Sequence, residues 1–492
     1  MDSLPLSGGI DQSCAVGAEL GRLRAFRGQL YGWLGRRADE LFELTDALLC
    51  TDAPVKTLVG LCLAPEHRRG HGALYDALNC GRVEADRFRE GLAGLPVPRM
   101  FGGRIVLAVD ATAWLRPDAE CCPQRLFCHV YGRGRRGAKQ RIPGWPYQLV
   151  VALESGPTSW TAALDVVRLG PADDATAVTA DQLRAVVGRL TAAGRWRPGD
   201  RPIMVMLDAG YDVHRLAFLL ADLPVHLVGR IRADRVLLGP APPPGGARRG
   251  GRPRRHGPVM ALADPSTWPA PSTQSVTDTP RYGQAEATGW DRMHPRLEHQ
   301  GAWAQHPGQL PIVEGTVIRL QVEHLPGQRE AKPIWLWSSH TSADTGGDTE
   351  RFAAEIIRCW QAYLRRFDLE HTIRLWKQTL GWTAPRLRSP EAADRWTWLI
   401  LAAHTQLRLA RHLAADLRRP WERPLPVERL TPARVRRGFR QLREKVSQPA
   451  GPPKPTHPGP GRPPGTTNRY RATRHDVGKT IKRDADPQRD GG

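Results

Sequence analysis

Residues 351–380, RFAAEIIRCWQAYLRRFDLEHTIRLWKQTL, carry the most informative pattern of the chain. Apolar residues recur there at steps of three and four, which is the period of an amphipathic helix. On such a helix, at roughly 100° per residue, four residues that carry polar groups fall within an arc of about 60° on the apolar side. They are Tyr363, Arg366, Glu370 and Lys377. A carboxylate flanked by two cations on this side indicates either a salt-bridged face whose long side chains reach water or a functional site.

The composition favours a partner that is a polyanion. The 492 residues have a formal net charge of +21, and nucleic acid is the usual partner of so basic a chain. The alternative is an arginine-rich coding bias together with a basic tail. No apolar run approaches the ~18 residues of a membrane span, and no signal-peptide core is present at the N-terminus. We therefore expect no membrane association.

The eight cysteines are scattered without a CxxC pair, so we expect free thiols rather than a disulfide framework. One cluster could bind zinc, although its spacing matches no common site. The cluster consists of Cys121, Cys122, Cys128 and His129.

The chain is expected to contain five segments. Residues 1–98 read as helices and are expected to form an N-terminal domain that binds DNA through basic turns such as His67-Arg68-Arg69; a simple helical bundle fits equally well. Residues 99–238 and 344–446 form the two parts of an α/β domain, and residues 239–343 a β-rich insertion. Residues 447–492, basic and rich in Pro and Gly, are expected to be disordered.

The α/β segment combines a three-strand meander with parallel crossovers, which predicts a mixed α/β sheet, as in the RNase H-like arrangement. Its expected strands span residues 104–112, 147–153, 160–169, 202–207 and 225–231, and its helices residues 173–193 and 211–222. In this arrangement the first and fourth strands are neighbours, so Asp110 and Asp208 would meet. Residues 113–145 fit no element.

Aspartate is depleted in strands and costly to bury unpaired, so stability alone explains Asp110 and Asp208 poorly. Asp208 could instead cap the following helix. Converging carboxylates suit a hard divalent cation, and with a third carboxylate they could hold two such ions.

The insertion begins with a basic loop, RRGGRPRRH at 248–256, and residues 261–311 appear irregular. Arg252, Arg254 and Arg255 in this loop are candidates for contact with the DNA minor groove, or belong to a solvated loop. Two strands are expected at 315–323 and 332–338. The tryptophans of the insertion could stack on a base or fill a small core: Trp290, Trp303, Trp335 and Trp337.

The four residues of the helix match Y-x2-R-x3-E-x6-K at every spacing, and they follow VDAT at Asp110 and LDAGYD at Asp208. By these motifs, residues 104–409 resemble the catalytic domain of the insertion-sequence-four-like group of DDE transposases. That group also has a β-rich insertion between the second aspartate and the glutamate of its motif. The cysteine- and arginine-rich stretch after Asp110 departs from the resemblance.

The resemblance implies an RNase H-like catalytic domain in which Asp110, Asp208 and Glu370 bind two Mg²⁺ or Mn²⁺ ions. Tyr363, Arg366 and Lys377 would hold DNA phosphates, and one of Trp290, Trp335 and Trp337 would take a flipped base. It further implies cut-and-paste transposition on terminal repeats and target DNA, a homodimer, and a bacterial cytoplasmic protein associated with the nucleoid. A transposase-derived DNA-binding protein and a structure-selective nuclease remain as alternatives.

Overall fold

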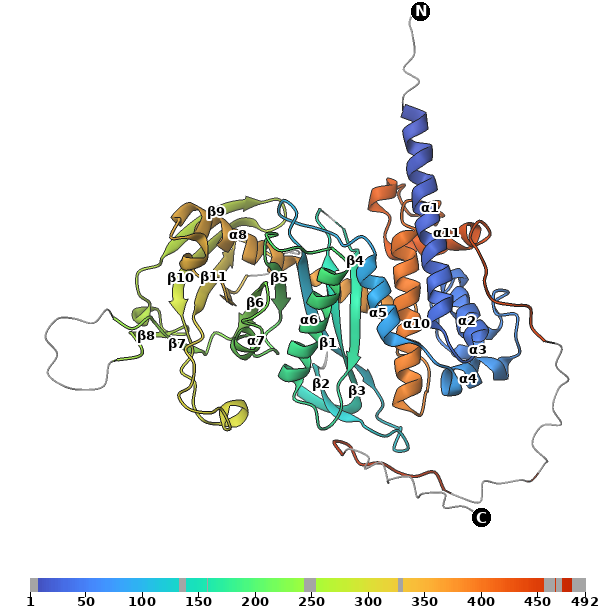
Figure 1. Cartoon of the computed structure of the whole chain (residues 1–492), viewed down its shortest axis with the longest axis horizontal. Helices are drawn as coiled ribbons and strands as arrows, with labels where there is room; N and C mark the ends of the chain where they lie inside the picture. Colours follow the sequence, from blue (N-terminus) through green and yellow to red (C-terminus); the bar gives the residue numbers. More distant parts are fainter. Residues whose placement is uncertain are drawn as a thin grey trace, which may run out of the picture.

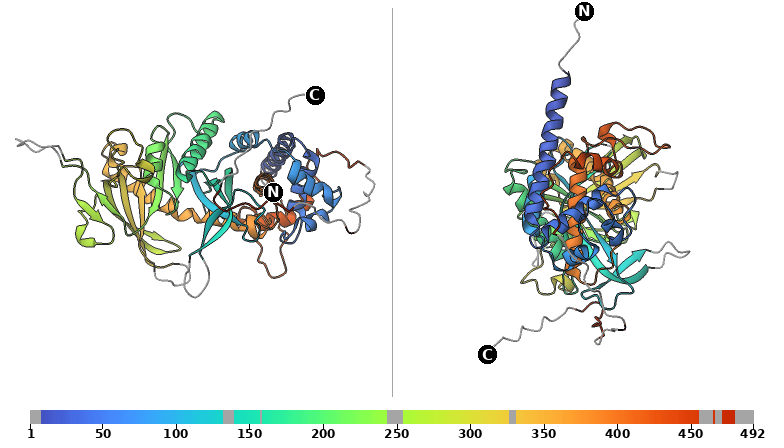
Figure 2. Two further views of the ribbon diagram at one scale, coloured as in Figure 1. Left: turned by 90° about the horizontal axis from the view of Figure 1, so that it is seen from below. Right: turned by 90° about the vertical axis from the view of Figure 1, so that its right-hand side faces the viewer.

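The computed structural model describes residues 8–131, 139–156, 158–242, 254–325, 331–454, 465 and 471–479. They form an elongated molecule in which a mixed sheet runs from a helical region at one end to the strands of the insertion at the other (Figure 1; Figure 2). Within these ranges no helix is long and apolar enough to cross a membrane. The mixed α/β sheet with helices confirms the expected fold class.

The centre of the sheet has the expected strand order. β1 pairs antiparallel with β3 and parallel with β5, and β5 pairs parallel with β6. A strand that had not been expected, β2, pairs with β3 inside the stretch after Asp110. The strands are β1 (Val106–Leu115), β2 (Leu126–Tyr131), β3 (Lys139–Leu153), β4 (Thr161–Arg168), β5 (Ile203–Leu207) and β6 (Val225–Ile231).

The strands of the insertion continue this sheet instead of forming a separate one. β12 pairs antiparallel with β6, and the sheet order is β2-β3-β1-β5-β6-β12-β11-β10-β9, with β4 beside β3. β7 and β8 form a small second sheet. The insertion contains β7 (Val236–Leu238), β8 (Val259–Ala261), β9 (Thr273–Thr279), β10 (Gly283–Met293), β11 (Gly315–Val322), β12 (Ile334–Ser338) and the 3-10 helices η1 (Pro265–Thr267) and η2 (Gly301–Trp303).

The expectation of irregular structure at 261–311 is wrong, because β9 and β10 form a hairpin there. Their alternation is hard to recognise in the sequence, since the inward residues of β10 include Ala285 and Ala287, which are small. Gly283, at the turn, has φ of 66°, a conformation that favours glycine.

Helices cover both faces of the sheet. On β1, Leu107 and Val109 join a core with Leu183 of α6, whereas Val106 and Ala108 join a second core with Ile356 of α8. This alternation follows from the two-residue period of a strand. The helices of these layers are α6 (Ala175–Ala192), α7 (Val213–Leu219), α8 (Thr349–Arg365), α9 (Phe367–Gln378) and α10 (Pro390–Leu409), and the 3-10 helix η3 (Ser342–Thr345) precedes α8.

The N-terminal helices share a core with α10 and α11. Arg27 of α1 is fully buried and contacts Asp46 of α2 and Gln406 of α10, each at 2.7 Å. Arg443 of α11 also donates to Asp46, at 3.0 Å. The elements of this region are α1 (Gly8–Trp33), α2 (Ala38–Cys50), α3 (Leu58–Cys62), α4 (His71–Cys80), α5 (Ala85–Gly94), η4 (Val427–Arg429) and α11 (Pro432–Arg443).

The basic cluster expected to contact DNA belongs to this packed region. Arg68 and Arg69 both pair with Glu43, which is fully buried, and Arg69 also pairs with Asp39 at 2.9 Å. His67 is buried as well. These ion pairs fasten the turn to the bundle, and its contact with DNA stays a prediction.

The described parts of the tail contact the body through hydrogen bonds, and the rest of the segment expected to be disordered lies outside the described residues. Arg68 donates to the carbonyl of Ala450 at 3.0 Å, and the amide of Gly451 donates to Asp39 at 3.1 Å. Further on, the amide of His475 donates to the carbonyl of Glu120 at 2.9 Å. Because these partners lie hundreds of residues away in the chain, composition alone could not predict them.

His404 of α10 makes stability depend on pH. It is fully buried between Trp160 and Trp376, and neither ring nitrogen has a hydrogen-bond partner among the described residues. Burial, aided by the charge of Arg408, lowers the pKa of His404 to about 3. The unfolded chain therefore takes up a proton below about pH 6.5 that the folded chain excludes, so this residue costs stability as the pH falls from 6.5 towards 3.

Replacing His404 with Leu should remove that contribution. Between pH 7 and pH 5 we expect the variant to lose about 2 kcal/mol less stability than the wild type, at 1.36 kcal/mol per pH unit below 6.5. Thermal melts at the two pH values measure this difference. His412→Leu, on the surface, is the control. Equal losses in wild type and His404→Leu would contradict the account.

Candidate active site

Asp110 and Asp208 occupy neighbouring positions in the sheet. The parallel register of β1 and β5 pairs Val109 with Leu207, and the two aspartates are the next residues in the chain. Asp110 lies within β1, where β3 continues as its partner, whereas β5 ends just before Asp208. The expected meeting of the two carboxylates at one sheet edge is therefore confirmed.

The helix expected at 351–380 is divided at Arg366, which lies between α8 and α9. Two hydrogen bonds of three-residue spacing flank this position: Arg366 N donates to Tyr363 O, and Leu369 N donates to Arg366 O, each at 3.0 Å. Such bonds tighten a helix locally. Tyr363 and Arg366 are buried, as the apolar side of the helix predicts.

The three acidic side chains of the site all lie close to the guanidinium of Arg366. It lies 3.4 Å from Asp110 Oδ2, 3.5 Å from Asp208 Oδ2 and 3.2 Å from Glu370 Oε1. Arg366 itself is 3% exposed, whereas the carboxylate side chains are 21, 37 and 43% exposed in the same order. Residues from β1, the end of β5 and α9 thus form one acidic cluster that opens to solvent around a buried cation.

The electrostatics of the cluster reflect its partial burial. Burial raises the pKa of Asp110 to about 6; Arg366 opposes this effect, and Asp208 reinforces it. Burial and the nearby Asp208 also raise the pKa of Tyr363 to about 12, so its hydroxyl is a hydrogen-bond donor, and it donates to Asp208 Oδ1 at 3.2 Å. Close packing of like charges at a solvent-accessible edge is typical of functional sites.

Lys377 lies next to the cluster without joining it. Its ammonium donates to Thr112 Oγ1 at 2.6 Å and to the carbonyl of Ala113 at 3.1 Å, both on β1. Burial lowers its pKa, although Asp110 acts in the opposite direction. The structure therefore brings all four residues of the helix motif to the edge that carries Asp110 and Asp208.

Other predicted site residues lie elsewhere. Arg252 falls outside the described residues. Arg254 is exposed in the segment that precedes β8, and Arg255 donates to the carbonyl of Leu310 at 2.8 Å. Neither contacts the acidic cluster through a hydrogen bond or ion pair that the structure records among its described residues.

The tryptophans of the insertion pack into its core. Trp290 and Trp335 are each 4% exposed and Trp337 is fully buried, so the base-stacking role is wrong for these three in this structure. Trp290 and Trp335 pack against Trp268 and against each other. Trp303 is half-buried against Phe218 and His306. The alternative interpretation, a packed core, is the one that the structure supports.

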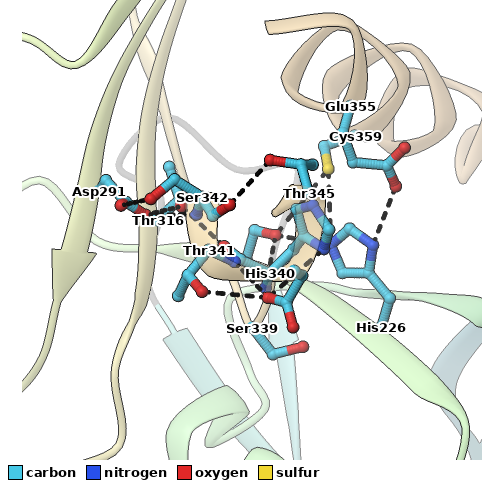
Figure 3. Close-up of polar contacts among 12 residues, drawn as sticks. His226, Asp291, Thr316, Ser339, His340, Thr341, Ser342, Thr345, Glu355 and Cys359 are labelled. Carbon is cyan, nitrogen blue, oxygen red and sulfur yellow. Dashed lines mark hydrogen bonds and ion pairs between the residues drawn. The ribbon is translucent and has the colours of Figure 1, made fainter. Parts of the chain in front are cut away.

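One group of potential metal ligands lies outside the acidic cluster. Among the described residues, only His226, Glu355 and Cys359 bring three ligand atoms within 4.8 Å of one another. Glu355 and Cys359 reach from α8 towards the ring of His226 on β6 (Figure 3). The cysteine cluster around Cys121 is not such a group.

The surroundings of this trio identify it as a buried polar network. Glu355 pairs with Arg104, and Ser338 Oγ lies 2.6 Å from His226 Nε2. Burial raises the pKa of the Cys359 thiol to about 12, whereas a metal ligand must be a thiolate. The network also lies at the start of β6, opposite the edge that carries Asp208.

The acidic cluster, in contrast, has the donors that a hard divalent cation requires, namely carboxylate oxygens from three separate elements. Their convergence on the guanidinium of Arg366 shows that a positive charge is favoured at this location. The residue types of Asp110, Asp208 and Glu370 therefore suit a divalent metal. Their oxygens do not all lie within 4.8 Å of one another, so ligation requires Arg366 to leave and the carboxylates to move closer together.

Tyr211 is a residue of this site that sequence reasoning missed. It follows Asp208 in a tight turn, closed by a hydrogen bond from Tyr211 N to Asp208 O at 3.1 Å. Its hydroxyl is buried and has no hydrogen-bond partner among the described residues. Burial raises its pKa well above the usual range, and the charges of Asp110 and Asp208 add to this effect. The position of Tyr211 in LDAGYD, three residues after Asp208, is the sequence feature that could have identified it.

Comparison with known families agrees with this geometry. A family model described as DDE superfamily endonuclease matches residues 29–296, which is more than half of the chain. The match includes Asp110 and Asp208 and ends before Glu370. The search of curated proteins found no match.

Proposed function

Because this chain belongs to the DDE superfamily endonuclease family, we propose that it is a DNA transposase whose catalytic acids are Asp110, Asp208 and Glu370. Endonucleases of this family act on DNA with divalent metal ions. The observation that carries the proposal is the convergence of these three carboxylates on Arg366, from a family-matched sheet and from a helix beyond the match.

The three carboxylates would hold two Mg²⁺ or Mn²⁺ ions. When bound, such ions lower the pKa of the attacking hydroxyl or water and stabilise the leaving oxygen of a phosphodiester. Arg366 and Lys377 lie beside this position and would neutralise the phosphate at the cut, Arg366 through paired hydrogen bonds and Lys377 as a point charge. Tyr363 orients Asp208 through its hydroxyl.

The finer assignment rests on the Y-x2-R-x3-E-x6-K spacing, which favours the insertion-sequence-four-like group. The substrates would then be the terminal repeats of an insertion sequence and a target DNA, joined by cut-and-paste within a homodimer on the bacterial nucleoid. The net charge of +21 supports a DNA partner.

A second candidate is a nuclease that cuts without joining. The family description names an endonuclease, and the matched segment contains only two of the three acids. The two functions make the same first cut and differ in what the freed 3′ hydroxyl does next.

The test is a reaction of purified protein with labelled duplexes copied from the DNA that flanks its coding region, plus a supercoiled plasmid and Mg²⁺. A transposase gives cut duplexes and duplex–plasmid joint molecules. Cut duplexes without joint molecules would support the nuclease. Binding without any cutting would leave a DNA-binding protein and overturn both enzymatic candidates.

The variant Tyr211→Phe tests whether the hydroxyl of Tyr211 takes part in the reaction. A buried hydroxyl without a partner costs desolvation energy, so its removal should raise stability by roughly 1 kcal/mol. If the hydroxyl donates to the phosphate or water in the reaction, cutting should slow by about tenfold, the equivalent of one ordinary hydrogen bond. Thermal melts and single-turnover cutting measure the two effects, with Tyr75→Phe as control. Unchanged cutting would exclude a role for Tyr211 in the reaction.

A further inference from the structure

The contacts of Arg366 differ from those of an ordinary structural ion pair. It reaches three carboxylates at 3.2–3.5 Å, whereas charge-assisted hydrogen bonds of this kind are usually about 2.7–2.9 Å long. The buried pair of Arg27 and Asp46, for comparison, is 2.7 Å apart. The Nε atom of Arg366 is buried and has no partner among the described residues. The guanidinium is thus shared among three acceptors without satisfying any of them closely.

The location of Arg366 conflicts with the metal site. The oxygens that it contacts are those that would ligate a divalent ion, and a cation already among them opposes the binding of another. The guanidinium also lies against the rings of Tyr363 and Phe367, at 5.7 and 5.4 Å from their centroids. Phe367 is 48% exposed, so this side of Arg366 leads towards solvent, from which a DNA phosphate would approach.

We propose that Arg366 is an internal counter-ion that closes the metal site in the free protein and leaves it when a DNA phosphate binds. This inference rests on the proposed function and names how the same site is regulated. DNA draws the guanidinium away from Asp110, Asp208 and Glu370, and the freed oxygens then accept metal. By linkage, DNA and metal strengthen each other's binding by the same factor. The protein alone would hold metal weakly and would not become a loaded nuclease away from DNA.

The test measures Mn²⁺ binding to the full-length protein by isothermal titration calorimetry, without and with a short non-specific duplex. Without DNA, Arg366→Gln should bind Mn²⁺ at least roughly tenfold more tightly than the wild type, within the usual range of coupling between sites. With the duplex, the affinity of the wild type should rise by a similar factor, whereas that of Arg366→Gln should change little. Arg366→Lys, which keeps the charge, should remain close to the wild type.

Arg365→Gln is the matched control, because Arg365 is the adjacent arginine and donates to backbone carbonyls of Glu154 and Thr158. Its Mn²⁺ affinity should stay within about twofold of the wild type, since it contacts none of the three carboxylates; the typical range of coupling starts above that value. Equal affinity of wild type and Arg366→Gln in the absence of DNA would overturn the proposal, and so would an equal gain in Arg365→Gln.

The measurement does not depend on catalysis, so the two proposals can fail separately. Tighter Mn²⁺ binding by Arg366→Gln, in a protein whose wild type neither cuts nor joins DNA, would support the counter-ion role of Arg366 and contradict the transposase function. Cutting and joining by the wild type, with equal Mn²⁺ affinity of the wild type and Arg366→Gln, would support the transposase function and contradict the counter-ion role. If the melting curve shows that Arg366→Gln is unfolded, the effect of DNA on the wild type is the test. A wild type whose Mn²⁺ affinity does not rise when DNA is added would then contradict the proposal.

Discussion

Glu370→Gln should abolish metal-dependent DNA cleavage while DNA binding is retained. The substitution keeps the shape of the side chain and removes the negative charge that a divalent ion requires. We expect a loss of at least about 10²–10³-fold in the rate of cutting, the scale on which removal of one electrostatic contact to the reacting groups acts. Glu370 is 43% exposed, so the fold should tolerate the change.

Single-turnover cleavage and gel-shift binding of the same duplex measure the two effects. Glu391→Gln, an exposed acid at the start of α10, is the control and should match the wild type in both. Rapid cutting by Glu370→Gln would show that the helix carboxylate is structural. Joint loss of cutting and binding would mean that Glu370 supports the DNA interface instead of the chemistry.

Glu355→Gln should be strongly destabilising. Glu355 is the carboxylate that pairs with Arg104, which is 4% exposed, and it also contacts His226 at 3.1 Å. Burial acts to raise its pKa, but His226 and Arg104 outweigh burial and hold the pKa well below the usual range. Neutralising it leaves the guanidinium of Arg104 buried without a countercharge, which costs about 3–5 kcal/mol.

The predicted result for Glu355→Gln is a melting temperature several degrees below that of the wild type, since ΔΔG of this size shifts a large domain by that much. Glu350→Gln, exposed on the first turn of the same helix, should change stability by no more than about 0.5 kcal/mol. A stable Glu355→Gln variant would contradict the ion-pair account. A higher melting temperature of the wild type on adding Zn²⁺, absent in Glu355→Gln, would identify a metal site there instead.

The elements that place the candidate site were predictable from local pattern. The apolar strands before Asp110 and Asp208 and the spacing from Tyr363 to Lys377 are short-range features. The parallel pairing of β1 with β5 was expected from the RNase H-like arrangement of the strands. These features placed two carboxylates at one sheet edge and a third on a helix packed against that sheet.

What could not be predicted depends on partners distant in the sequence. The sharing of a core between the N-terminal helices and α10 depends on Arg27 meeting Asp46 and Gln406. The contact of the tail with the body depends on backbone hydrogen bonds to residues such as Glu120. The burial of Trp337 required knowing that β12 joins β6, since a tryptophan in a strand suits either a core or an exposed stacking surface.

The role of Arg366 was the least accessible from sequence. Its spacing predicts that it shares a helix face with Glu370, but the contacts to Asp110 and Asp208 arise from the packing of α9 over β1. The family resemblance implies that Arg366 binds a DNA phosphate, whereas in the structure its guanidinium lies among the three carboxylates.

The most direct test of the catalytic site is the location of Mn²⁺ by anomalous diffraction from crystals of the protein with a bound duplex. We expect anomalous density among the carboxylates of Asp110, Asp208 and Glu370, with Arg366 turned towards a phosphate. Density at His226, Glu355 and Cys359 instead, or no density near Asp110 in a DNA complex, would contradict it.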